Sequence, residues 1–205
     1  MGIPVCTFIL GPMEMGCIMN DSFNFELFDE AMDFVFRWEG GLCEDKNDTG
    51  GITNYGICLR FLKSVDPKAT REDIKNMTKD KAKDLFYQNF WLPCRCDELP
   101  DKVAFVLFDT AINTGVSQAS KFLQRVVGVK DDGKVGPDTV NAVKEYVEKN
   151  DEADLVTEFL KKRSQFYKNL VVKNPSQKVF LKGWLNRTVA VAAAATVSTG
   201  ETKLA

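Results

Sequence analysis

Apolar residues recur every three or four positions along most of this chain, and that period restricts it to a mainly helical fold. The first helix is predicted between the capping run Asn20–Ser22 and the helix-ending pair Gly40-Gly41. Its apolar stripe is formed by Leu27, Ala31, Val35 and Trp38. The helical period is lost over residues 42–57 and then returns, continuing to about residue 197.

Capping residues and helix breakers divide the second, longer helical region into separate elements. Thr70–Asp73 has the form of a capping box, and Pro137 is predicted at a helix N-terminus, where proline is well tolerated. The further predicted boundaries are Thr78, Pro93, Pro100, Gly115, Ser117, Gly128 and Asn174-Pro175. Two long helices are expected near residues 151–170 and 177–197.

Residues 42–57 have a different composition from the rest of the chain. They combine Gly50, Gly51 and Gly56 with several Asp and Asn residues and short β-capable pieces. Such a pattern is typical of turns joining very short strands. The predicted fold class is therefore mainly α, with a small β-hairpin or irregular excursion after the first helix.

The absence of histidine excludes several kinds of site. Ser-His and Cys-His triads, and zinc sites of the HExxH type, all require the imidazole ring. The formal net charge of −2 provides no bulk attraction to nucleic acid or to an anionic membrane, and the basic residues look scattered. Chemistry in this chain must therefore rest on carboxylates, hydroxyls, amides, thiols or lysines.

The chain has six cysteines, and a chain of 205 residues can bury a core without disulfides. They are Cys6, Cys17, Cys43, Cys58, Cys94 and Cys96. Cys94 and Cys96 are too close together for a CxxC redox or zinc motif. We expect free thiols; one or more disulfides, or a metal site, are the alternatives.

Residues 1–22 are predicted to form a poorly structured N-terminal arm. They contain Pro4, Gly11 and Pro12 and lack the basic region of a signal peptide. This composition also fits poorly with a membrane span. We therefore expect synthesis in the cytoplasm without a clear signal peptide, and no stable membrane insertion.

Glu39 is the candidate catalytic residue with the strongest local support. It follows Trp38 at the end of an apolar helix and precedes two glycines. A general acid for glycoside cleavage needs a raised pKa, which apolar neighbours and a helix C-terminus both favour. The glycines leave room for a sugar ring beside the carboxyl group. This combination indicates glycoside chemistry with Glu39 as the acid.

A second polar group is needed across the scissile bond to orient water or to stabilise positive charge. Asp48 or Asp45 could serve, with the Thr53 hydroxyl helping to hold the water; the alternative is that the aspartates are turn residues. Asp45–Gly50 begins like a calcium-binding EF-hand loop, but Gly56 stands where the bidentate glutamate belongs. We therefore expect no metal and no other cofactor.

These residues resemble a known signature. Trp38–Gly41, Asp45, Asp48, Gly50-Gly51 and Thr53–Ile57 are similar to the motif of glycoside hydrolase family 108, with Leu42 in place of the tyrosine of its EGGY sequence. The resemblance continues through Phe86–Trp91, Cys96–Pro100 and Phe108–Gly115. Further matches, to its C-terminal predicted peptidoglycan-binding segment and closing motif, are Leu123-Gln124, Gly128, Asp132-Gly133, Gly136, Thr139 and Gly183–Arg187.

The resemblance covers roughly residues 23–190 and implies a lysozyme-like helical fold. The family comprises bacterial and phage N-acetylmuramidases, including endolysins, and some members are described as secretion activators. Its essential glutamate corresponds to Glu39, with Asp48 and Thr53 following as in phage lysozymes. The implied organisation is a catalytic region at residues 23–98 and a helical peptidoglycan-binding region at 99–205, packed together.

Several further residues are candidates for binding the glycan. Trp38, Asn54 and Tyr55 lie within the motif, and Trp91 could stack on a sugar, although aromatic residues at helical spacing are often core. Asp109 and Asn113 share one face of an otherwise apolar helix, so they either brace loops or line the cleft. The basic run Lys161–Arg163 is expected on a solvated helix face.

The sequence therefore predicts an enzyme acting on the bacterial cell wall or in the periplasm, with peptidoglycan strands as its partner and no role in nucleic-acid binding. Glu39 would protonate the β-1,4 bond between N-acetylmuramic acid and N-acetylglucosamine. Two alternatives remain: a non-catalytic peptidoglycan-binding or secretion-accessory protein, and a lytic transglycosylase that uses the same glutamate.

Overall fold

The computed structural model describes residues 25–38, 43–44 and 52–197, and within them the fold is mainly α, as predicted. The N-terminal arm expected at residues 1–22 lies outside the described residues. The helices are α1 (Phe25–Trp38), α2 (Leu59–Val65), α3 (Arg71–Lys75), α4 (Lys79–Phe86), α5 (Asp101–Thr114), α6 (Val116–Val127), α7 (Pro137–Lys149), α8 (Glu152–Lys173) and α9 (Lys178–Val197). Short helical turns lie at Tyr87–Trp91, Cys96–Glu98 and Pro175–Gln177.

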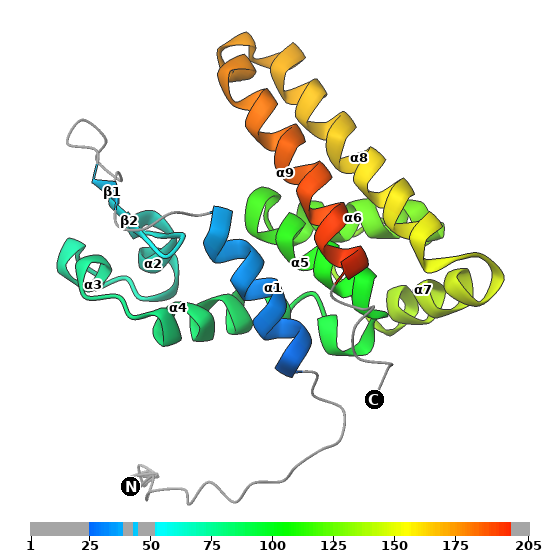
Figure 1. Ribbon diagram of the computed structural model, residues 1–205, viewed down its shortest axis with the longest axis horizontal. Coiled ribbons are helices and arrows are strands. Elements are labelled where there is room, and N and C mark those ends of the chain that lie inside the picture. The colour runs from blue at the N-terminus through cyan, green and yellow to red at the C-terminus, as the bar shows by residue number, and fades with distance from the viewer. Residues whose placement is uncertain (1–24, 39–42, 45–51, 198–205) are drawn as a thin grey trace, which may run out of the picture.

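The small β excursion after the first helix is confirmed. Strands β1 (Cys43–Glu44), β2 (Ile52–Asn54) and β3 (Ile57–Cys58) form an antiparallel sheet in the order β1-β2-β3. Tyr55 and Gly56 connect β2 to β3 with φ values of 49° and 78°. Positive φ at both positions matches the twist that a two-residue hairpin turn requires. The sheet lies beside α2 and α3 (Figure 1).

Helix boundaries agree closely with the predicted caps. Thr70 and Asp73 form the complete capping box, and the Thr78 hydroxyl accepts a hydrogen bond from the backbone N–H of Lys81. Gly115 and Gly128 end α5 and α6 with φ values of 85° and 76°, a region that favours glycine. Pro137 is the first residue of α7. Pro93 lies beyond the end of α4, which continues into a π-helical turn at Tyr87–Trp91.

Helix α5 lies at the centre of the molecule. Every residue from Val103 to Ala111 is buried, so this helix is enclosed on all sides rather than along one stripe. Its neighbours are α1, α6, α8 and α9 (Figure 1). One hydrophobic core runs from Leu27 on α1 to Ala195 on α9. The N-terminal and C-terminal halves of the chain therefore share a core, with α5 between them.

Candidate functional site

The sequence places the catalytic candidates between α1 and β2. Glu39, Asp48 and the alternative Asp45 lie outside the described residues, so their roles stay predictions. The structure does describe the elements on both sides of this segment. Helix α1 ends at Trp38, and β2 begins at Ile52.

Trp38 is presented to solvent at the C-terminal end of α1. It is 41 % exposed, and its ring lies 6.3 Å from that of Phe34. Phe34 is buried and contacts Phe105 of α5 edge to face at 5.6 Å. Because Phe34 is fixed in the core, it anchors the position of Trp38, while part of the Trp38 side chain stays accessible to solvent. It can therefore contact a ligand at the position before Glu39.

The sheet holds three of the predicted residues in different environments. Thr53 is half-buried on the central strand, opposite Cys43 and Cys58. Asn54 is buried, and its Nδ2 donates a hydrogen bond of 3.1 Å to the carbonyl oxygen of Ile74. That bond ties β2 to the residues of α3, which is a structural function. Substrate contact by Thr53 and Asn54 stays a prediction.

Tyr55 is oriented by its turn conformation and by an aromatic neighbour. Its ring lies 5.8 Å from that of Phe36 in an edge-to-face contact. Phe36 belongs to the last turn of α1 and also lies under the Lys79 ammonium group, 5.1 Å from it. The half-buried Tyr55 thus joins the sheet to the end of α1. Trp38, Thr53 and Tyr55 are consequently positioned on the elements that flank Glu39 and Asp48 in the sequence.

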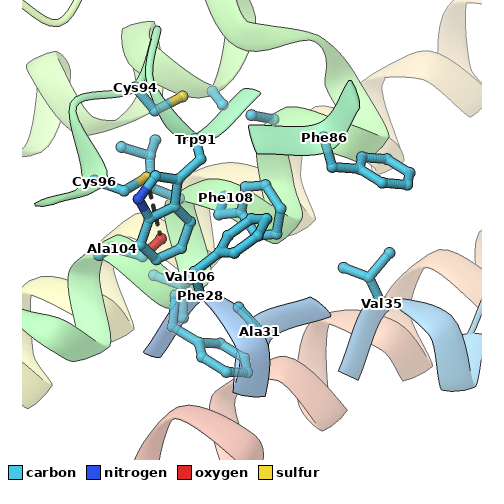
Figure 2. Packing of buried hydrophobic residues seen from close by; sticks show 14 of the residues in the cluster. Phe28, Ala31, Val35, Phe86, Trp91, Cys94, Cys96, Ala104, Val106 and Phe108 are labelled. Atoms are coloured by element: carbon cyan, nitrogen blue, oxygen red, sulfur yellow. Dashed lines mark hydrogen bonds between the residues drawn. The ribbon is translucent and has the colours of Figure 1, made fainter. Parts of the chain in front are cut away.

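The prediction that Trp91 stacks on a sugar is wrong. Trp91 is fully buried, and its ring packs edge to face against those of Phe28 and Phe108, each 5.2 Å away (Figure 2). Its indole Nε1 donates a hydrogen bond of 2.8 Å to Asp97 Oδ1. No face of the ring is left for a ligand. Trp91 is a core residue whose polar atom is satisfied internally.

The same Asp97 carboxylate influences Tyr87. The Tyr87 hydroxyl lies 3.5 Å from Asp97 Oδ2, and burial together with this negative neighbour raises the pKa of Tyr87 to about 12, from 10.0. The folded state therefore favours neutral Tyr87. Its contribution to stability is complete below pH 10 and is lost as the pH rises through about 12.

We expect the free energy of unfolding to fall between pH 10 and about 12, and to fall less in a Tyr87→Phe variant. Urea unfolding at a series of alkaline pH values measures this. Tyr146→Phe, at a half-buried tyrosine on α7, is the control and should leave the parent profile unchanged. Identical profiles for Tyr87→Phe and the parent would contradict the assignment.

Asp109 is likewise excluded from a glycan cleft, so its predicted role in substrate binding is wrong. It is 1 % exposed, and both carboxylate oxygens are bound by arginines. Arg163 Nη1 donates to Oδ2 at 2.6 Å, and Arg187 Nε donates to Oδ1 at 2.9 Å. Asn113 is half-buried, and its amide donates to the Asp109 carbonyl oxygen at 2.8 Å. Asp109 therefore has the alternative function considered for it, which is to brace neighbouring elements of the fold.

Arg163 was expected on a solvated face but is fully buried. It also donates to Thr110 Oγ1 at 3.0 Å and to the Tyr167 hydroxyl at 3.2 Å. Burial raises the pKa of Tyr167, which keeps that hydroxyl neutral beside the guanidinium group. These residues, with Asp109 and Arg187, form a charged network that links α5, α8 and α9. The network holds the middle of α8 and the middle of α9 against α5.

The environment of Cys96 disfavours its use as a nucleophile. Cys58, Cys94 and Cys96 are free thiols, and the last two are buried. Burial, with the neighbouring Cys94, raises the pKa of the Cys96 thiol, which donates to the Ala104 carbonyl oxygen at 3.8 Å (Figure 2). A nucleophilic cysteine needs the thiolate form, so this environment opposes such chemistry.

A groove of about 290 Å³ lies between α6 and α8 and was not predicted from the sequence. Its lining includes the amides of Gln118, Gln165 and Asn169, the cations Arg125, Lys162 and Lys173, and the rings of Phe122 and Phe166. Amides, cations and aromatic rings together suit a polar ligand that carries both hydroxyl and carboxylate groups. In the sequence, polar residues on two separate helices cannot be distinguished from residues of ordinary solvent-exposed faces. The groove is recognised only once the fold brings the two helices together.

Comparison with known proteins divides the chain between two family models. The model described as Glycosyl hydrolase 108 matches residues 32–115, and the one described as Predicted Peptidoglycan domain matches residues 118–189. The solved structure of Brucella abortus SagA has 34 % sequence identity and a TM-score of 0.75, covering 87 % of this chain and 99 % of that one. No curated protein matches the chain at a significant level.

Proposed function

Because the chain belongs to the glycosyl hydrolase 108 family, we propose that it hydrolyses the β-1,4 bond between N-acetylmuramic acid and N-acetylglucosamine, with Glu39 as general acid. Family membership makes it a peptidoglycan hydrolase or peptidoglycan-binding protein with a lysozyme-like fold. Its place of action is thus the cell wall. The observation that carries the finer proposal is the hydrolase match over residues 32–115, which contains Trp38–Gly41, Asp48 and Thr53.

In the proposed reaction Glu39 donates a proton to the glycosidic oxygen as the bond between this oxygen and the anomeric carbon of N-acetylmuramic acid breaks. Asp48, with Thr53, orients the attacking water or stabilises the positive charge that develops on the sugar ring. Trp38 and Tyr55 contact the glycan from the end of α1 and from the β2–β3 turn. This placement is supported by the 41 % exposure of Trp38 and by the fixed position of Tyr55 against Phe36.

Mass spectrometry of the products tests the reaction. Purified peptidoglycan sacculi are digested with the full chain, and the released fragments are analysed. Hydrolysis is expected to leave reducing N-acetylmuramic acid ends that carry one added water. Ends with a 1,6-anhydro ring would instead identify a lytic transglycosylase. Sacculi that are bound but not cut would identify a non-catalytic binding protein.

The groove between α6 and α8 is the proposed contact of the C-terminal region with peptidoglycan. All of its lining residues fall within residues 118–189, the range matched by the peptidoglycan model. Arg125 is already paired with Asp131 at 2.6 Å. Lys162 and Lys173 have no acidic partner among the described residues and can meet the carboxylates of stem peptides.

A Lys162→Ala/Gln165→Ala double variant is expected to bind sacculi roughly tenfold more weakly, since a hydrogen bond and a charge-assisted bond are lost. Co-sedimentation with sacculi measures this. Lys149→Ala, at an exposed lysine on α7 outside the groove, is the control. Equal binding by the double variant and the control would remove the groove from the proposal without affecting the proposed cleavage.

A further inference from the structure

The turn between α8 and α9 projects beyond the other helices (Figure 1). The turn itself is ordered by Asn174, whose Oδ1 accepts hydrogen bonds from the backbone N–H and the hydroxyl of Ser176 at 3.2 and 2.7 Å. Further along the two helices, the Asp109–Arg163–Arg187 network holds the middle of the hairpin. We call the segment from Lys168 to Lys182 the hairpin tip. It is a convex, internally braced projection.

The hairpin tip exposes large apolar side chains. Val172 is 79 % exposed, Val179 77 % and Phe180 53 %. The Phe180 ring lies 5.8 Å from that of Trp184, which stacks on Tyr167 at 5.0 Å. This aromatic row continues into the hairpin and holds Phe180 at the tip. More than half of the surface of each of these three residues is accessible, and an exposed apolar group of this kind marks an interaction surface.

The hairpin tip is also strongly basic. No aspartate or glutamate occurs from residue 159 to residue 200, although the whole chain has a net charge of −2. The lysines of the tip are Lys168, Lys173, Lys178 and Lys182, and each is exposed. Among the described residues none of the four forms an ion pair. The expectation that basic residues are scattered is therefore wrong for this segment.

We propose that the hairpin tip binds the surface of an anionic phospholipid membrane. Val172, Val179 and Phe180 would enter the interface between headgroups and acyl chains, while the ammonium groups of Lys168, Lys178 and Lys182 contact lipid phosphates. A glycan is a poorer fit, because small ligands are bound in concave sites and the hairpin tip is convex. A protein partner fits less well too, since lysine is depleted in the cores of protein interfaces.

This binding is peripheral. Within the described part of the chain no helix is long and apolar enough to cross a bilayer. The tip instead combines a few apolar side chains with several cations, and both contributions are needed for stable attachment to an interface. The proposal is independent of the proposed cleavage, because it concerns a different surface and a different chemistry.

Co-sedimentation of the full chain with lipid vesicles tests the proposal. Binding is expected to vesicles that contain phosphatidylglycerol, with much weaker binding to pure phosphatidylcholine vesicles and a decrease as salt is added. A Lys178→Gln/Lys182→Gln variant should lose roughly 30-fold in affinity, at about fivefold for each lysine. A Val179→Ser/Phe180→Ser variant should lose at least roughly tenfold.

Val189→Ser is the matched control, because Val189 is 71 % exposed on the same helix but lies outside the tip. It should bind vesicles like the parent, and all three variants should cut purified sacculi at the parent rate. Equal binding to anionic and neutral vesicles would overturn the proposal. The proposal would also be overturned if the tip variants lost binding to sacculi but kept binding to vesicles. The same holds if their only effect were to abolish self-association of the chain.

Discussion

A Glu39→Gln variant is expected to fold like the parent and to release reducing ends from sacculi about 10² to 10⁴ times more slowly, the usual contribution of a general acid. Glutamine has nearly the shape of glutamic acid but carries no transferable proton. The proton is needed as the glycosidic bond breaks, so the effect should appear in the chemical step. A reducing-end assay on purified sacculi measures it.

Glu30→Gln is the matched control, because Glu30 is an exposed glutamate on α1. It should cleave at the parent rate, and both variants should have the parent circular dichroism spectrum. Sacculus binding by Glu39→Gln should be retained, since the proposed binding groove lies between α6 and α8. A folded Glu39→Gln protein that cuts at the parent rate would disprove the role of Glu39, whatever the fate of the binding groove.

The largest loss of stability is expected from Asp109→Asn, at about 3–5 kcal/mol in the free energy of unfolding. Asparagine fills the same space but removes the negative charge that the buried guanidinium groups of Arg163 and Arg187 contact. Arg163 is fully buried and Arg187 is 7 % exposed, so water cannot replace the carboxylate. Urea unfolding followed by circular dichroism measures the change.

Asp84→Asn, at an exposed aspartate on α4, is the control and should change stability by less than about 0.5 kcal/mol. A triple variant, Asp109→Leu with Arg163→Met and Arg187→Met, removes the charges together and should recover most of the lost stability. This triple variant separates unpaired charge from disturbed packing. A loss below about 1 kcal/mol for Asp109→Asn would show that the network is not important for stability.

Helix boundaries could be predicted from the sequence because a cap acts within one turn of the chain. The Thr70–Asp73 capping box, the Thr78 cap and the glycine ends at Gly115 and Gly128 each depend on neighbours three or four residues away. The family could be inferred for a related reason, since its motif occupies a short run around Glu39. Local patterns of this kind do not depend on the tertiary fold.

The candidate site was predicted less completely. Trp38 and Tyr55 lie on the elements that flank Glu39, but Trp91 is a core residue. A tryptophan at helical spacing can face either solvent or core, and the sequence pattern alone does not distinguish these environments. The groove between α6 and α8 was missed because Gln118 and Gln165 lie 47 positions apart. Their proximity depends on how the two helices pack.

By itself, then, the sequence determined the helices, their caps and the small sheet after the first helix, and it led to the prediction that Glu39 donates the proton. Only the tertiary structure decided the environments of Trp91, Asp109 and Arg163. Asp109 meets its arginines across 54 and 78 residues of chain. Whether such a charge is solvated or buried depends on which helices pack around α5, because burial is a property of the assembled core and not of neighbouring residues in the sequence.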